Sequence, residues 1–145
     1  MDAAGDLRAE IEKTLPRLRA LDEAAAMRDR GPGKWVRKEV LGHLIDSAAN
    51  NIQRFVRAAL AGRLAFPDYE QDGWVALQRY RQRPWKELVG LFEALNRHVA
   101  HAMESVAADR LAAPCVIGND APVTLEWLMQ DYVRHLRHHL AQIVT

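Results

Sequence analysis

The chain of 145 residues has the size of one ordinary domain, and its 49% hydrophobic and 27% charged residues exclude a disordered or membrane-embedded protein. No apolar stretch approaches the ~20 residues that a membrane span needs, and a net charge of +1 provides no field for nucleic acid or anionic lipid. Residues 1–6 lack the pattern of a secretory leader, and Cys115 is the only cysteine. We therefore expect a cytoplasmic protein with a single domain over residues 1–145 and no membrane or nucleic-acid partner.

The first predicted helix covers residues 7–21, where apolar residues recur at spacings of three and four. Pro16 falls inside this pattern. Either it kinks the helix, or Thr14 caps a second segment whose first turn tolerates the proline. The sequence Gly31-Pro32-Gly33 then predicts a tight connection to the next helix.

A second helix is predicted over residues 40–60, ending before Gly62. Its apolar stripe consists of Val40, Leu41, Leu44, Ile45, Ala48, Ile52, Phe55, Val56 and Leu60. At 100° per residue, His43 lies on the opposite side of this helix. Two arrangements are open: the helix packs on both sides, or the His43 side lines a wetter cleft while the stripe forms the core or a partner interface.

Residues 62–83 predict a long connection with one short helix over 74–80, since they contain helix-breaking glycine and proline. A basic run in this region is interleaved with aromatic residues, a pattern more typical of a solvated turn than of a nucleic-acid contact. It comprises Arg79, Arg81, Arg83 and Lys86 among Trp74, Tyr80 and Trp85.

A third helix is predicted from Trp85 to about Val106, followed by a second long loop in which residues 115–117 are compatible with a very short strand. Thr124 is suited to cap the last helix. Four helices of this length predict an all-α four-helix bundle with two long connections.

His135 and His139 are four residues apart in this last helix, so both imidazoles can face one ion. His43 is the obvious third ligand. Three imidazoles with an open coordination position suit a divalent ion such as zinc or nickel. On spacing alone, six histidines in a helical chain produce this pair often by chance, so surface histidines remain the simpler interpretation.

Two stretches favour the metal site, because KWVRKEVLGHLIDSA (34–48) and DYVRHLRHHLAQI (131–143) resemble signatures of the DinB/YfiT-like family of four-helix-bundle metalloenzymes. FPDY (66–69) and the aromatic residues after it are similar to one branch of that family. The resemblance implies a divalent metal held by His43, His135 and His139. The chain departs from the family pattern at Val36, where a Ser or Thr would supply an N-cap hydroxyl.

Characterised relatives include transferases and isomerases that use bacillithiol or mycothiol, so the resemblance implies thiol-dependent transfer to a small electrophile. The alternative is a non-catalytic metal- or ligand-binding bundle that acts in stress response. Arg54 and Asn50 are candidate contacts for a low-molecular-weight thiol.

Several polar residues are candidates to orient a ligand imidazole: Asp46, Asn50, Asp131 and Gln142. No catalytic residue is assigned, and Cys115 is interpreted as an ordinary loop thiol. A second apolar surface on the helix at 40–60 predicts a homodimer.

Overall fold

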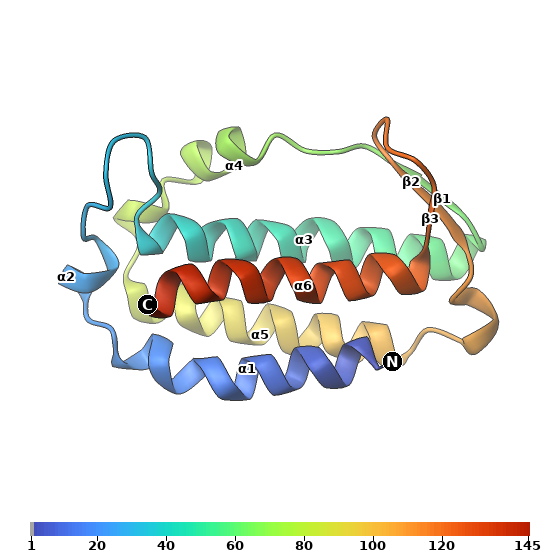
Figure 1. Cartoon of the computed structure of the whole chain (residues 1–145), viewed down its shortest axis with the longest axis horizontal. Helices are drawn as coiled ribbons and strands as arrows, with labels where there is room; N and C mark the ends of the chain where they lie inside the picture. Colours follow the sequence, from blue (N-terminus) through green and yellow to red (C-terminus); the bar gives the residue numbers. More distant parts are fainter. Residues whose placement is uncertain (1) are drawn as a thin grey trace.

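The computed structural model describes residues 2–145 and confirms the predicted all-α four-helix bundle (Figure 1). The long helices are α1 (Ala3–Ala20), α3 (Arg37–Ala61), α5 (Trp85–Glu104) and α6 (Leu125–Val144). Helices α1 and α3 each pack against both α5 and α6, so consecutive helices α1 and α3 occupy diagonal corners of the bundle. Helices α3 and α5 run in the same direction, because the long connection between them returns along the bundle (Figure 1).

Helix α1 is one continuous helix that includes Pro16, so the alternative in which Thr14 caps a second segment is wrong. The helix begins after Asp2, whose side chain accepts a hydrogen bond from the backbone N–H of Gly5. Pro16 removes one backbone hydrogen bond from the helix. Buried residues before and after it, including Leu15 and Leu18, keep the helix continuous across this position.

The tight turn predicted at Gly31-Pro32-Gly33 is present, with a 3.2 Å bond from the Lys34 N–H to the Gly31 carbonyl, but the whole connection from α1 to α3 is longer than this turn. It contains the short helix α2 (Glu23–Ala26), capped by Asp22, before the turn at residues 31–33. A chain that passes from one corner of the bundle to the diagonal corner must cross its end, and this segment makes the crossing.

Helix α3 is buried on both sides, which decides between the two arrangements left open by the sequence. Leu41 and His43 point to different sides of the helix, yet neither is exposed to solvent. His43 itself packs against α6, and the neighbouring Gly42 and Asp46 are covered by α4 (Gln71–Gln78) and the 3-10 turn η1 (Tyr80–Gln82). The short helix predicted at 74–80 corresponds to α4 and the start of η1. The predicted stripe is wrong at its far end, where Val56 and Leu60 are 42% and 78% exposed.

The start of α3 is stabilised without an N-cap hydroxyl. Val36 has no side-chain acceptor, but the Glu39 carboxylate accepts a hydrogen bond of 3.0 Å from the Val36 backbone N–H. This is the reciprocal half of a capping box, so one of the two usual bonds remains.

Tyr80 fixes the connection 62–84 against α3. Its ring is 2% exposed and lies over Gly42, where any Cβ would come within 2.1 Å of the ring. Its hydroxyl donates a 2.6 Å hydrogen bond to Asp46, which also accepts from the Gln78 amide. Glycine at position 42 is therefore required for this close approach.

A small sheet joins the second and third connections at one end of the bundle (Figure 1). Its strands are β1 (Leu64–Phe66), β2 (Pro114–Ile117) and β3 (Val123–Thr124), with β1 parallel to β2 and β2 antiparallel to β3. The sequence predicted only the region of β2. Cys115 lies in this strand, completely buried, and burial raises the pKa of its thiol.

Helices α5 and α6 agree closely with the sequence predictions. Helix α5 ends at Glu104, and the Thr124 hydroxyl accepts a 3.1 Å bond from the Trp127 backbone N–H at the start of α6. None of the helices described over residues 2–145 is both long and apolar enough to cross a membrane.

Candidate metal centre

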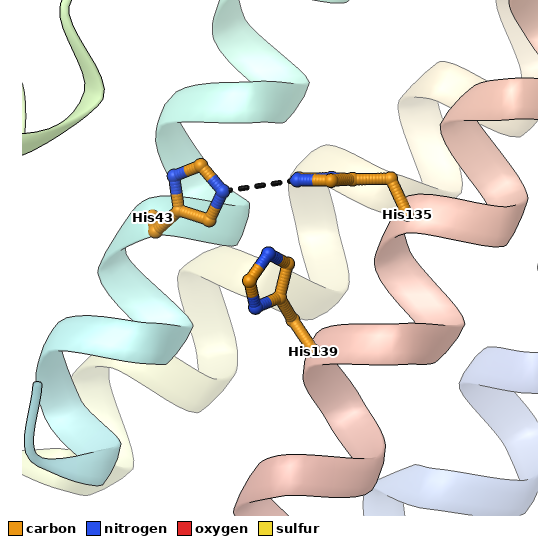
Figure 2. A group of neighbouring side chains, drawn as sticks. All are labelled: His43, His135 and His139. Atoms are coloured by element: carbon orange, nitrogen blue, oxygen red, sulfur yellow. Dashed lines mark hydrogen bonds between the residues drawn. The ribbon is translucent and has the colours of Figure 1, made fainter. Parts of the chain in front are cut away.

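Three histidines converge between α3 and α6 (Figure 2). His43 projects from α3, while His135 and His139 project from consecutive turns of α6. One ring nitrogen from each histidine lies within 4.8 Å of the other two. The structure thus brings together the three side chains that the sequence singled out.

The spacing of one pair of ring nitrogens, those of His43 and His135, matches two ligands of one ion. The Nε2 atoms of His43 and His135 are 3.1 Å apart. With metal–nitrogen bonds of about 2.0–2.1 Å, two imidazole nitrogens on one ion lie about 2.9–3.3 Å apart for bond angles between right-angled and tetrahedral. Each pair of rings is close to perpendicular, with interplanar angles of 77°, 77° and 74°.

All three imidazoles are held in the neutral form that can ligate a metal. Burial, together with the neighbouring rings of His135 and His139, lowers the pKa of His43 to about 3. Burial also lowers the pKa of His135 to about 4 and lowers that of His139. At neutral pH the cluster therefore presents lone pairs rather than positive charges.

Gln142 orients one of the rings. Its Oε1 lies 3.0 Å from Nδ1 of His139, and since this amide oxygen can only accept, Nδ1 must carry the proton. The lone pair of His139 is then on Nε2, the nitrogen available to an ion. Trp35 packs against the cluster, with its ring centroid 5.1 Å from that of His43.

The other predicted polar residues lie around the cluster without contacting a ligand ring. The Asp46 carboxylate binds Tyr80 and Gln78, and the Asn50 amide donates a 2.9 Å bond to the Asp46 carbonyl of its own helix. Asp131 forms a 3.4 Å ion pair with Arg134, and its charge counteracts part of the lowering of the His135 pKa. The remaining histidines, His98, His101 and His138, are exposed.

Two hollows flank the histidine cluster on different sides. The first is an open groove of about 560 Å³ at His139 and Gln142, lined also by Trp35, Arg30 and Lys34. The second is a smaller cavity of about 150 Å³ at His135. It is lined by Ser47, Asn51, Arg54, Asp68, Tyr69, Gln71, Leu128, Asp131, Tyr132 and His135.

Sequence reasoning did not assign a role to the residues of the connection that reach these hollows. Asp72 borders the groove, while Asp68 and Tyr69 border the cavity. The FPDY sequence (66–69) provides only a point of family resemblance. Its position beside the histidine cluster depends on how the connection 62–84 folds back over α3, which the sequence does not reveal.

Comparison with known proteins places this arrangement in a family. The model of the DinB superfamily matches residues 6–143. The chain belongs to the DinB superfamily. This match covers all four bundle helices and the three histidines.

Two curated relatives match most of this chain at 26% and 28% identity. A candidate metal-dependent hydrolase of Halalkalibacterium halodurans is 26% identical over 124 residues, which cover 86% of this chain and 72% of the relative. Another, from Geobacillus thermodenitrificans, is 28% identical over 114 residues, covering 78% of this chain and 64% of the relative.

Solved structures share the fold of this DinB protein at lower identity. YfiT from Bacillus subtilis, described as a probable metal-dependent hydrolase with an unusual four-helix bundle topology, superposes with a TM-score of 0.86 at 20% identity. The alignment covers 97% of this chain and 81% of YfiT. A mycothiol-dependent maleylpyruvate isomerase superposes with a TM-score of 0.78 at 12% identity, over 97% of this chain and 59% of the isomerase.

Proposed function

We propose that the protein is a metal-dependent enzyme that binds one divalent ion, zinc or nickel, through His43, His135 and His139, and catalyses thiol-dependent transfer to a small electrophile. The convergence of three neutral imidazoles supports the metal site. The fold shared with a mycothiol-dependent isomerase supports a thiol as co-substrate.

The residues present fit a catalytic divalent ion. Three nitrogen ligands are typical of catalytic zinc, which keeps a further position open for water or substrate. Because all three ligands are neutral, the ion would retain its full charge, and it would lower the pKa of a bound thiol. Gln142 fixes the proton of His139 on the nitrogen remote from the ion, which is the usual role of an outer hydrogen-bond partner.

The observation that carries the proposal is the presence of two separate hollows at one histidine cluster. A transfer reaction needs room for two organic molecules, whereas hydrolysis needs room for one and a water. The larger, open groove at His139 would hold the thiol, with Arg30 and Lys34 at its wall to attract anionic groups. The smaller cavity at His135 would hold the electrophile.

The metal site is tested by measuring metal content and affinity after chelation and reloading. We expect wild type to bind one equivalent, and His43→Ala, His135→Ala and His139→Ala to lose most of the affinity. His98→Ala is the matched control, because His98 is exposed on α5. Equal stoichiometry and affinity in all five proteins would refute the three-histidine site.

The reaction is tested with metal-loaded protein, a model electrophile, and bacillithiol, mycothiol, glutathione or cysteine in turn. We expect turnover with at least one thiol and loss of turnover in His135→Ala. Cleavage of ester or amide probes without any thiol would instead favour hydrolysis, the activity named for several relatives. A fully loaded protein that turns over none of these compounds would favour the non-catalytic binding function.

A further inference from the structure

We propose that Arg54 is a carboxylate-binding residue in the small cavity beside His135, so that the small substrate of this enzyme is a carboxylic acid. This inference rests on the proposed function, since it identifies the substrate class of that same site. Its basis is the state of the Arg54 side chain and the composition of the cavity wall.

Arg54 is a buried cation whose hydrogen-bonding capacity is largely unused. The residue is only 7% exposed, and its buried Nε has no hydrogen-bond partner among residues 2–145. Its Nη2 reaches only the Pro67 carbonyl, at a long 3.5 Å. A buried charge without such partners is costly, and a ligand that accepts hydrogen bonds from the terminal Nη groups would offset part of this cost.

Aromatic contacts hold the guanidinium in place but leave its donors free. Its central carbon lies 5.8 Å from the ring centroid of Phe66 and 5.9 Å from that of Tyr69. These contacts with ring faces stabilise the positive charge without using an N–H group. Within residues 2–145 the only hydrogen bond of Arg54 is the long one from Nη2, and the residue lines the cavity, so its two terminal Nη groups can donate to the two oxygens of a carboxylate.

The charges around the cavity favour a single negative charge. Arg54 is its only lining cation within the described chain, and two acids, Asp68 and Asp131, also line it. Asp131 is paired with Arg134, whereas Asp68 is exposed, accepts from the Tyr69 backbone N–H, and carries a negative charge that counteracts part of the lowering of the Arg54 pKa by burial. A carboxylate monoanion balances Arg54, whereas a phosphate dianion would add repulsion with these acids.

The neutral groups and the small volume of the cavity favour a short ligand that accepts hydrogen bonds. Tyr69 and Ser47 provide hydroxyls at the wall, and burial raises the pKa of Tyr69 to about 12, so that its hydroxyl keeps its proton and can donate. A volume of about 150 Å³ is small beside the roughly 300–1,000 Å³ of pockets for drug-sized ligands. The cavity therefore suits a short acid whose other end reaches the histidine cluster.

The test uses protein loaded with Co²⁺ and follows thiol binding by the charge-transfer absorbance of the cobalt thiolate. The probes are 3-mercaptopropionate, which carries a carboxylate, and 1-propanethiol, which does not. We expect wild type to bind 3-mercaptopropionate about tenfold to a hundredfold more tightly than 1-propanethiol, as charge-assisted hydrogen bonds allow.

Substitutions of Arg54 test whether this residue causes the preference for 3-mercaptopropionate. Arg54→Gln should abolish the preference and leave 1-propanethiol binding unchanged, and Arg54→Lys should retain part of it, because lysine keeps the charge but not the fork. The matched control is the double variant Arg30→Gln/Lys34→Gln, which removes the cations of the open groove and should leave the preference intact. Asp68→Asn keeps an acceptor for the Tyr69 N–H and should increase the preference.

Each outcome separates this inference from the function on which it rests. A preference that survives in both Arg54 variants, or that disappears in the groove variant instead, overturns the assignment of Arg54 while the metal site stands. Failure of wild type to bind Co²⁺ or either thiol refutes the proposed function itself. If Arg54→Gln does not fold, as judged by circular dichroism, the lysine and Asp68 variants still decide the question.

Discussion

Replacement of Gly42 by alanine tests how the connection 62–84 is held against α3. The new Cβ would lie 2.1, 2.4 and 2.5 Å from three atoms of the Tyr80 ring, which is buried and cannot swing into solvent. The ring must shift, which costs about 1–3 kcal/mol for overpacking and strains a buried bond to Asp46 worth about 1.5–3 kcal/mol. Alanine returns about 1 kcal/mol through helix propensity, so we expect a net destabilisation of about 1.5–5 kcal/mol if the bond to Asp46 is lost.

The assay is equilibrium unfolding in urea, with Gly90→Ala as the matched control. Gly90 also lies inside a long helix, but a Cβ there would meet no heavy atom within 4 Å. We expect Gly90→Ala to stabilise the protein by about 0.5–1 kcal/mol. Similar effects of the two substitutions would show that the contact between Tyr80 and α3 does not constrain the fold, and would refute the reasoning.

Three further predictions concern the histidine cluster and the surface of α3. Gln142→Leu removes the acceptor for His139 Nδ1–H, so metal affinity should fall about 10–100-fold in equilibrium titrations; an unchanged affinity would contradict this orienting role. In metal-free protein, the pKa of His43 near 3 lies below its ordinary value of 6.5, so the unfolded chain takes up the proton first. His43 alone should therefore lower the unfolding free energy by about 1.4 kcal/mol per pH unit as pH drops from about 6.5 toward 3. The lowered pKa values of His135 and His139 add to this slope, and His43→Asn should remove the His43 part of it. If the predicted homodimer forms through the exposed end of α3, Val56→Ser/Leu60→Ser should give monomers in sedimentation equilibrium, and an unchanged association state would exclude this surface.

The long helices and the Thr124 cap could be predicted from sequence because they depend on residues close together in the chain. Periodicity requires only one buried face, and a cap requires only a few neighbouring residues. The same reasoning predicted a pair of imidazoles from the spacing of His135 and His139.

The sheet and the covering of α3 depend on contacts between distant parts of the chain. Leu64 pairs with Cys115, about fifty residues further on, and strands of two to four residues carry no periodic signal of their own. Periodicity places His43 on the polar side of α3, yet its ring is buried against Trp35, which precedes α3, and against His135 and His139 of α6. The third ligand could therefore be predicted from family resemblance but not from periodicity.

Metal ligation and substrate contact depend on different parts of the chain, the bundle helices and the connection 62–84. The three imidazoles project from bundle helices, whereas Asp68, Tyr69 and Asp72 of the connection form walls of both hollows. Surface connections accept changes in length and sequence more readily than packed helices do. We therefore expect substrate choice to diverge among relatives through residues 67–72 while the ligands stay constant, and an exchange of this segment between two relatives should transfer selectivity without loss of the ion.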